Sequence, residues 1–154
     1  MTLIVKRVTT TEELEIAKAL RWRVFIEEQG FDGDIEVDEY DAKDSTYHFI
    51  GKDVEQDKYV AVARVLMYPA ERKAKIGRVA VLAECRGKQY GVALMSAVEQ
   101  AVVDDGIELY ALSAQYDKKG FYERCGYACA SDEIYLEEGV KHCMMTKKAV
   151  KAAN

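Results

Sequence analysis

The stretch GRVAVLAECRGKQYGVALMSAVEQAVV, residues 77–103, restricts the fold more than any other part of the chain. The run that ends at Leu82 is nearly all apolar, as expected of a strand that is covered on both faces. Apolar residues then recur at helical spacing from Leu94 to Val102, and Gly106 ends the pattern. A buried strand that leads through a short basic loop into an amphipathic helix is a unit of α/β folds. The sequence therefore predicts a sheet flanked by helices.

The other predicted elements alternate in the same way. The first helix begins with a capping box, Thr10 with Glu13 three residues on, and ends near Gly30. Residues 31–45 hold seven acidic residues against one lysine, which indicates a loop or a helix fragment held by its neighbours. Strands are predicted at residues 3–8, 46–54, 58–68, 75–82 and 107–115, a short helix at 118–126, and a final hairpin from 127–134 and 141–148. This order predicts a mixed sheet.

Length and charge restrict the class of protein. The 154 residues contain no linker, repeat or low-complexity segment, so we expect a single domain over residues 1–154. A net charge of −5 argues against a nucleic-acid partner, because phosphate backbones favour clustered positive charge. The N-terminal apolar run is too short for a secretory signal, and no stretch is long enough to span a membrane, so we expect a cytoplasmic protein without a membrane partner. In that setting Cys85, Cys125, Cys129 and Cys143 are expected to be free buried thiols.

The loop CRGKQYG, residues 85–91, has features of an anion site. The free backbone N–H groups and the positive end of the dipole at a helix start favour an anion. Gly87 and Gly91 remove side chains where a pyrophosphate would approach, while Arg86 and Lys88 add positive charge. The loop has neither the Gly-Lys-Ser/Thr ending of a P-loop nor the three glycines of a Rossmann fingerprint. By itself it fits an anion cradle and an ordinary surface turn about equally well.

Four stretches together resemble one family. RVAVLAECRGKQYGVALMSAVEQ, residues 78–100, resembles motif A of the GCN5-related N-acetyltransferases (GNAT), and LSAQYDKKGFYERCGY, residues 112–127, resembles the second signature of that family. Residues 21–41 and 131–145, with VF-x-x-EQ and an acidic-Gly-x-x-His ending, resemble its small ElaA/YjcF branch. The resemblance implies the α/β acyl-CoA N-acyltransferase fold. In that fold a mostly antiparallel sheet with a splayed parallel strand pair is flanked by helices.

The resemblance also implies acetyl-CoA as the cofactor, with no metal. Its pyrophosphate would bind at Arg86, Gly87, Lys88, Gln89, Tyr90, Gly91 and Val92, its pantetheine arm along Val79, Ala80 and Val81, and Gln115 and Phe121 would also contact it. Gln115 could equally be a solvated strand end. Gln89 departs from the family, which usually has glycine there. If the loop requires a positive φ, this residue costs about 1 kcal/mol or more, and we expect weakened rather than abolished cofactor binding.

The family mechanism is direct attack of a deprotonated primary amine on the thioester in a ternary complex. Tyr122 matches the tyrosine that protonates the leaving CoA thiolate, although helical periodicity alone favours a core aromatic residue. A backbone N–H near Val81 would stabilise the oxyanion. The candidate bases are Glu28, its neighbour Glu27 and His142, and a water chain is the alternative. Each of these side chains also has an ordinary structural interpretation, as a solvated helix end or a hydrogen-bonded strand histidine.

The acceptor is the least constrained part of the prediction. The acidic residues between Asp32 and Asp44 could attract a polyamine, a lysine side chain or an amino sugar, or form a solvated loop. His48 is expected to be structural. The resemblance does not distinguish a monomer from a homodimer. The alternative to an enzyme is a non-catalytic acetyl-CoA sensor or interaction module on the same fold, which the Gln89 departure motivates.

Other chemistries fit less well. Cys125, Cys129, His142 and Cys143 together suggest a metal site, but their spacing is not that of a zinc site. A nucleophilic pair of Cys143 with His142 fails because adjacent strand residues point to opposite faces.

Overall fold

The computed structural model describes residues 2–150, without the side chains of residues 34 and 35. Residue 1 and residues 151–154 of the predicted domain lie outside the described part. The strands are β1 Leu3–Arg7, β2 Thr46–Asp53, β3 Lys58–Tyr68, β4 Lys73–Val81, β5 Leu109–Gln115, β6 Ala128–Cys129, β7 Tyr135–Glu137 and β8 Val140–Lys148. The helices are α1 Thr11–Arg21, α2 Gly33–Glu36, α3 Tyr90–Val102 and α4 Lys119–Arg124, with a π-helix at Trp22–Glu28 and a 3₁₀ turn at Glu39–Ala42.

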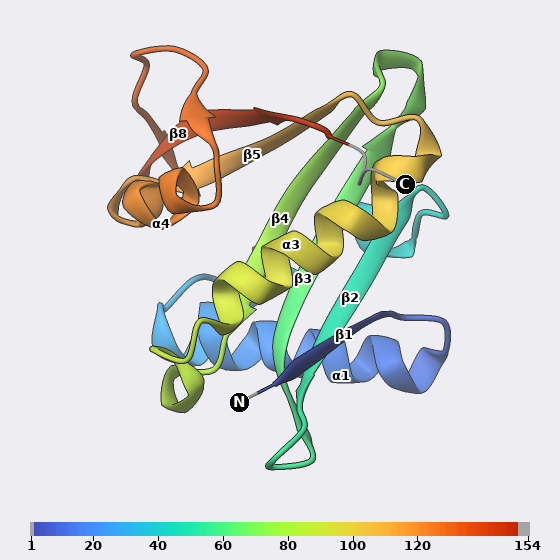
Figure 1. Ribbon diagram of the computed structural model, residues 1–154. Coiled ribbons are helices and arrows are strands. Elements are labelled where there is room, and N and C mark those ends of the chain that lie inside the picture. Colours follow the sequence, from blue (N-terminus) through green and yellow to red (C-terminus); the bar gives the residue numbers. More distant parts are fainter. Residues whose placement is uncertain (1, 151–154) are drawn as a thin grey trace.

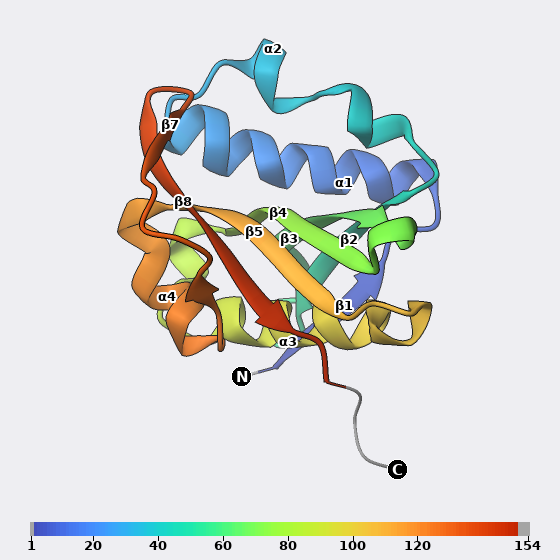
Figure 2. The same cartoon turned by 90° about the horizontal axis from the view of Figure 1, so that it is seen from above.

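The strands form one mixed sheet between two layers of helices. Its order is β1-β2-β3-β4-β5-β8-β6, with β7 also paired to β8. The helix α1 lies on one face, and α3 and α4 lie on the other (Figure 2). The predicted mixed α/β architecture is confirmed.

Strands β4 and β5 are the parallel pair of this sheet. Their pairing is short, because only Lys73–Lys75 of β4 lie opposite Leu109–Ala111 of β5. Beyond these residues the two strands separate, and Figure 1 shows them diverging from a common end. The other strand pairs are antiparallel. The splayed parallel pair that the resemblance implies is therefore present, and the gap it leaves lies between the π-helix on one face of the sheet and the start of α3 on the other.

The first helix begins and ends differently from a plain α-helix. Its N-cap Thr10 accepts from the N–H of Glu13 at 3.1 Å, as predicted. The return bond of the capping box is shifted by one residue, because the Glu13 carboxylate accepts from the N–H of Thr9 at 2.9 Å. From Trp22 to Glu28 the helix widens into a π-helix, which the sequence did not predict. This widened turn ends at Gln29, beside the gap between β4 and β5.

The C-terminal hairpin is more broken than predicted. Only Ala128 and Cys129 of the first predicted strand are in β6, and the short strand β7 pairs with the start of β8 instead. The residues between β6 and β7 are exposed and have no apolar face to bury, which explains why no strand forms there.

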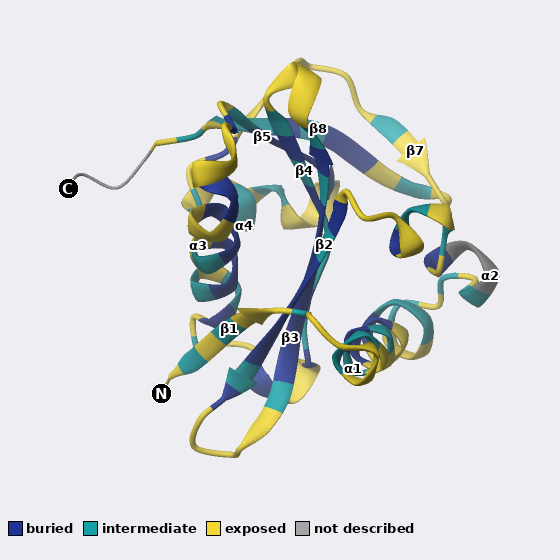
Figure 3. Ribbon diagram, turned by 90° about the vertical axis from the view of Figure 1, so that its right-hand side faces the viewer, coloured by how far each residue is buried: buried dark blue, intermediate teal, exposed yellow. Residues whose placement is uncertain are grey.

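The core lies on both faces of the sheet. In Figure 3 the central strands are buried, while α1 and α3 turn exposed residues outward. Phe49 and Ile50 of β2 and Val62 and Val65 of β3 are almost fully buried, as is Leu94 of α3. No helix in the described part of the chain is long and apolar enough to cross a membrane.

The acidic segment after α1 is held by buried arginines. Arg21 is fully buried and donates to Glu36 at 2.6 Å and to both oxygens of Asp41 at 2.7 and 3.0 Å. Arg64 of β3 donates to Asp38 at 2.7 Å and to Asp41 at 3.1 Å. The predicted helix fragment held by its neighbours is therefore present, and these carboxylates are paired ions rather than a solvated loop.

Asp41 is the centre of this cluster. Burial by itself would raise the pKa of its carboxyl group, but the bonds from Arg21 and the nearby charge of Arg64 hold that pKa well below its ordinary value. The carboxylate therefore contributes stability above the unfolded-state pKa of about 3.9, and this contribution is lost as the pH falls below that value.

Asp41→Asn should lower the free energy of unfolding by about 3 kcal/mol at pH 7, because it removes the carboxylate that two buried guanidinium groups share. Urea unfolding at pH 7 and pH 3 measures this, and the difference between variant and wild type should shrink at pH 3. The control is Asp57→Asn, whose side chain is 85% exposed, and which should change stability by less than about 0.5 kcal/mol. Equal effects of the two substitutions would contradict a stabilising role for the cluster.

Candidate functional site

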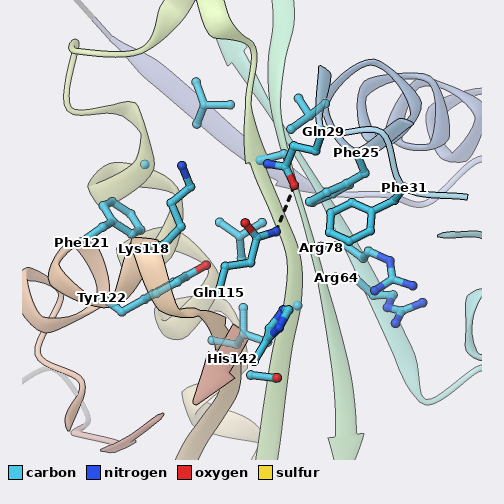
Figure 4. Close-up of a pocket in the computed structure, with 18 of the residues that line it drawn as sticks. Phe25, Gln29, Phe31, Arg64, Arg78, Gln115, Lys118, Phe121, Tyr122 and His142 are labelled. Atoms are coloured by element: carbon cyan, nitrogen blue, oxygen red, sulfur yellow. Dashed lines mark hydrogen bonds between the residues drawn. The ribbon is translucent and has the colours of Figure 1, made fainter. Parts of the chain in front are cut away.

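A cavity of about 810 Å³ occupies the gap between the splayed strands. It runs from the loop before α3, along β4, to the segment that follows the π-helix and to the turn before β8. Most of the residues that the resemblance assigns to the site line it: Val79, Ala80, Val81, Arg86, Gly87, Gln89, Tyr90, Gly91, Val92, Gln115, Phe121, Tyr122 and His142. Figure 4 shows Tyr122 entering from the α4 side and His142 from β8. The fold thus brings four separate parts of the sequence to one cavity.

The loop between β4 and α3 has the left-handed backbone that glycine favours. Gly87 has φ +82°, and Gln89, the N-cap of α3, has φ +66° and ψ +15°. The Gln89 side chain makes no capping bond, so it does not compete for the free N–H groups of the first turn of α3. These N–H groups suit an anion at the edge of the cavity. Gln89 therefore has the positive φ that the sequence analysis considered, and this left-handed conformation costs a glutamine about 1 kcal/mol.

Tyr90 anchors the loop to the sheet. Its ring is 3% exposed, and its hydroxyl donates to Asp53 at the end of β2 at 2.8 Å. Burial and this carboxylate raise the pKa of Tyr90 to about 12. Lys88 lies outside the cavity lining, with its ammonium 4.0 Å from the same carboxylate. The positive charge of Lys88 is thus directed to Asp53 rather than into the cavity.

Gly91 gives room for the Phe121 ring, and its backbone angles do not call for glycine. A β-carbon at this position would lie 2.9 Å from two ring carbons of Phe121, a distance that real contacts essentially never show. Phe121 belongs to α4, so its ring closes the cavity against the start of α3. The two motifs of the sequence meet at this contact.

The Arg86 side chain is tied to the end of the first helix. Its guanidinium donates to the two carboxylate oxygens of Glu28 at 2.5 and 2.7 Å. It also donates to the carbonyl of Val81 at 3.1 Å. The bond from Arg86 lowers the pKa of Glu28. Glu28 and its neighbour Glu27 face a separate small hollow and not the main cavity. A paired carboxylate of lowered pKa is a weak base, which argues against Glu28 in that role.

A β-bulge shapes the wall of β4. Val62 pairs with Ala80 and Arg64 pairs with Gly77, so that Arg78 and Val79 together face one residue of β3. Arg78 has the left-handed backbone of the bulge, with φ +51°, and its guanidinium donates to the carbonyl of Glu36 at 3.0 Å. Bulges re-aim backbone groups and occur next to active sites. This one lies where the pantetheine arm and the oxyanion are predicted.

Tyr122 occupies the α4 side of the cavity. Its ring packs edge-on against Phe121, with centroids 5.0 Å apart, and against Tyr127 at 6.2 Å. Its hydroxyl points into the cavity (Figure 4). Burial raises the pKa of this phenol well above its ordinary value, so it stays protonated at neutral pH. The ring of Tyr122 packs against other aromatic rings, as a core residue does, while its hydroxyl faces the cavity.

His142 reaches the cavity from β8. Its Nδ1 lies 2.7 Å from the carbonyl of Val140, and a carbonyl can only accept, so Nδ1 carries the hydrogen. Its Nε2 lies 3.4 Å from Glu137, and its ring stacks on Tyr135. A proton taken up at Nε2 would therefore be next to a carboxylate.

A bond between two glutamines crosses the cavity. Gln115 at the end of β5 donates to Gln29 at the end of the π-helix at 2.9 Å, as the dashed line in Figure 4 shows. Gln115 is therefore not a solvated strand end. The sequence analysis did not identify Gln29 as a site residue. It is the glutamine of the VF-x-x-EQ segment, and that segment is the signal that could have found it.

His48 lies away from these residues, in β2. Its Nε2 is 3.1 Å from the Asp41 carbonyl, and burial lowers its pKa, in agreement with a structural histidine. Within the part of the chain that the structure describes, no three His, Cys, Asp or Glu side chains are grouped so as to hold a metal ion.

Comparison with known proteins agrees with this geometry. Residues 14–127 match the model of the acetyltransferase (GNAT) family. An uncharacterized N-acetyltransferase of Bacillus subtilis, YjcF, is 32% identical over 88% of this chain and 93% of its own. The crystal structure of Escherichia coli ElaA is similar with a TM-score of 0.80 at 27% identity over 95% of this chain and 99% of that chain. The same TM-score is found for an acyl-CoA N-acyltransferase of Pseudomonas aeruginosa, at 28% identity over 95% and 99% of the two chains.

Gln89→Gly should raise the free energy of unfolding by up to about 1 kcal/mol and leave the Kd for acetyl-CoA unchanged or lower, because it removes the cost of a left-handed glutamine. Urea unfolding and isothermal calorimetry measure the two effects. Gly87→Ala is the matched control, since its φ is +82° and an added β-carbon meets nothing within 4 Å. It should act in the opposite direction. A several-fold loss of acetyl-CoA affinity in Gln89→Gly would show instead that the glutamine side chain binds the cofactor.

Proposed function

Because the chain belongs to the GNAT acetyltransferase family, we propose that it transfers an acetyl group from acetyl-CoA to a primary amine within a ternary complex. The observation that carries this proposal is the convergence of Tyr122 and His142 on a cavity whose other end is the loop at the start of α3. Bound acetyl-CoA supplies an activated thioester and a thiolate leaving group.

The binding of the cofactor is assigned to backbone groups. The free N–H groups at the start of α3 and the left-handed loop around Gly87 would hold the pyrophosphate. Val79–Val81 lie beyond the pairing of β4 with β5, so their β5-facing edge has no strand partner there. An amide-rich pantetheine arm can hydrogen-bond to such an edge as an added strand does. The Arg86 guanidinium, already held by Glu28, fixes the loop to the first helix.

Tyr122 is the proposed general acid. Its hydroxyl points into the cavity and keeps its proton at neutral pH, since burial raises its pKa. The thiolate sulfur takes that proton as the thioester carbon–sulfur bond breaks. A backbone N–H near Val81, next to the β4 bulge, would donate to the oxyanion.

His142 is the proposed base. With Nδ1 bonded to the Val140 carbonyl, Nε2 is free to take a proton from the acceptor ammonium, directly or through water. The ring nitrogen that takes this proton lies 3.4 Å from the Glu137 carboxylate. The amine would enter from the side of Phe25 and Phe31, which lie across the cavity from Tyr122 (Figure 4).

Tyr122→Phe should lower kcat by about 100-fold or more, because it removes the proton donor while the ring remains. The Kd for acetyl-CoA should stay within about twofold. Thiol release from acetyl-CoA with a panel of amines measures the first, and calorimetry measures the second. Tyr116→Phe, at a residue 41% exposed, is the matched control and should change neither.

Unchanged turnover in Tyr122→Phe would remove this residue from the mechanism. The same assay separates the enzyme from a non-catalytic sensor. An enzyme releases CoA only when an amine is present, whereas a sensor binds acetyl-CoA without releasing thiol for any amine.

The pH dependence should show a rising acid limb and no alkaline limb below pH about 10, because the raised pKa of Tyr122 keeps the acid protonated there. Measuring kcat/KM from pH 6 to above pH 9, with the ionisation of the amine itself determined separately, checks this. His142→Gln should lower kcat while leaving the Kd for acetyl-CoA within about twofold, because it removes the proposed base and not a cofactor contact. An alkaline limb that begins near pH 8 and disappears in Tyr122→Phe would contradict the raised pKa of Tyr122, and one that persists in Tyr122→Phe would assign the acid to another group.

A further inference from the structure

Two of the four cysteines lie next to each other in space. The Sγ atoms of Cys129, the last residue of β6, and Cys143, in β8, are 4.0 Å apart. Cys129 lies opposite Met145 in the pairing of the two strands, so Cys143 is its diagonal neighbour on the same face of the sheet. The other two cysteines, Cys85 and Cys125, make no contact with a further thiol among the described residues.

The two thiols differ in their access to solvent. Cys129 is exposed and Cys125 is half-buried, which corrects the expectation that all four thiols are buried, whereas Cys143 is 2% exposed. Burial raises the pKa of the Cys143 thiol. A dissolved oxidant would therefore meet Cys129 first, with Cys143 directly behind it to resolve the product.

The pair lies at the base of a segment that reaches the cavity. Residues 130–142 join the two cysteines and contain β7, whose Tyr135 stacks on His142 and whose Glu137 lies 3.4 Å from the same ring. His142 precedes Cys143 and points to the opposite face of β8, so the thiols are not part of the proposed catalytic set. Lys147, on the same face as Cys143, bonds to Glu99 of α3, which places the thiols on the α3 side.

We propose that Cys129 and Cys143 are a redox-active thiol pair that a peroxide closes to a disulfide in the folded protein, fixing residues 130–142 at their base. The Cys129 sulfur attacks the peroxide O–O bond, one water leaves, and a sulfenic acid remains. The Cys143 sulfur then attacks the Cys129 sulfur, the S–S bond forms, and a second water leaves. Two thiols and one hydrogen peroxide give one disulfide and two waters, and a dithiol reverses the step. This inference does not rest on the acetyl transfer proposed above.

The geometry requires a modest closure. The sulfurs must approach from 4.0 Å to about 2.0 Å, the length of a disulfide bond. Cys129 ends its strand and is followed by exposed residues, so its side of the pair can make this movement while Cys143 stays packed.

The test is to oxidise the folded full-length protein with hydrogen peroxide and to alkylate the remaining thiols after unfolding. The expected result is that free thiols fall from four to two, that the mass falls by about 2 Da, and that dithiothreitol restores both. Trypsin should yield one cross-linked pair of peptides, residues 125–141 with 142–147, and fragmentation assigns the bond to Cys129 rather than Cys125. The oxidised protein should also show a Tm higher by about 5 °C.

Substitutions supply the controls. Cys129→Ser, at the exposed position, should fold normally, and its three remaining cysteines should all stay as free thiols under the same dose of hydrogen peroxide. Cys125→Ser, on the same tryptic peptide, should still lose two thiols. A disulfide that forms in Cys129→Ser through Cys125 would overturn the proposal. So would a bond between two chains, or over-oxidation of Cys129 to sulfinic acid without loss of the Cys143 thiol.

Discussion

The early separation of β4 from β5 is the constraint on which the site depends. The two strands pair only through Lys73–Lys75 and Leu109–Ala111, so the far half of each has an edge without a strand partner. Everything proposed for catalysis stands around this gap. The loop that follows β4 lies at one end, α4 follows β5, and β8 runs beside β5 and delivers His142. A sheet that stayed fully paired would have no room for a thioester between these groups.

Contacts on both faces of the sheet hold the gap in shape. On the α1 face, buried arginines clamp the acidic segment to the sheet, and the π-helix brings Gln29 to its bond with Gln115. On the other face, Phe121 packs on Gly91. The acidic segment therefore has less charge available for a cationic acceptor than its composition suggests. The charges in this part of the molecule pair with one another and stabilise the fold, because buried ions are stable only when paired.

Burial and bonding partners decide the chemistry of the polar groups in and beside the cavity. It raises the pKa of Tyr122, which suits an acid, while the bond from Arg86 lowers the pKa of Glu28, which does not suit a base. His142 keeps one nitrogen bonded to a carbonyl and turns the other toward Glu137. The sequence did not choose between Glu28 and His142 as the base, and their bonding partners distinguish them.

The sequence by itself determined most of the helices and strands and the position of the loop, but not the π-helix or the broken C-terminal hairpin, because helical and strand periodicity and the spacing of a motif are local properties. The strand before Leu82, the helix after it and the capping of Thr10 were all predicted from residues close together in the chain. Only the tertiary structure decided what depends on distant partners. Gln29 meets Gln115 across 86 positions, and Arg86 meets Glu28 across 58. The closeness of Cys129 to Cys143 belongs to the same class, since it depends on how β6 pairs with β8. The motif raised the possibility of a left-handed Gln89, and the structure decided it.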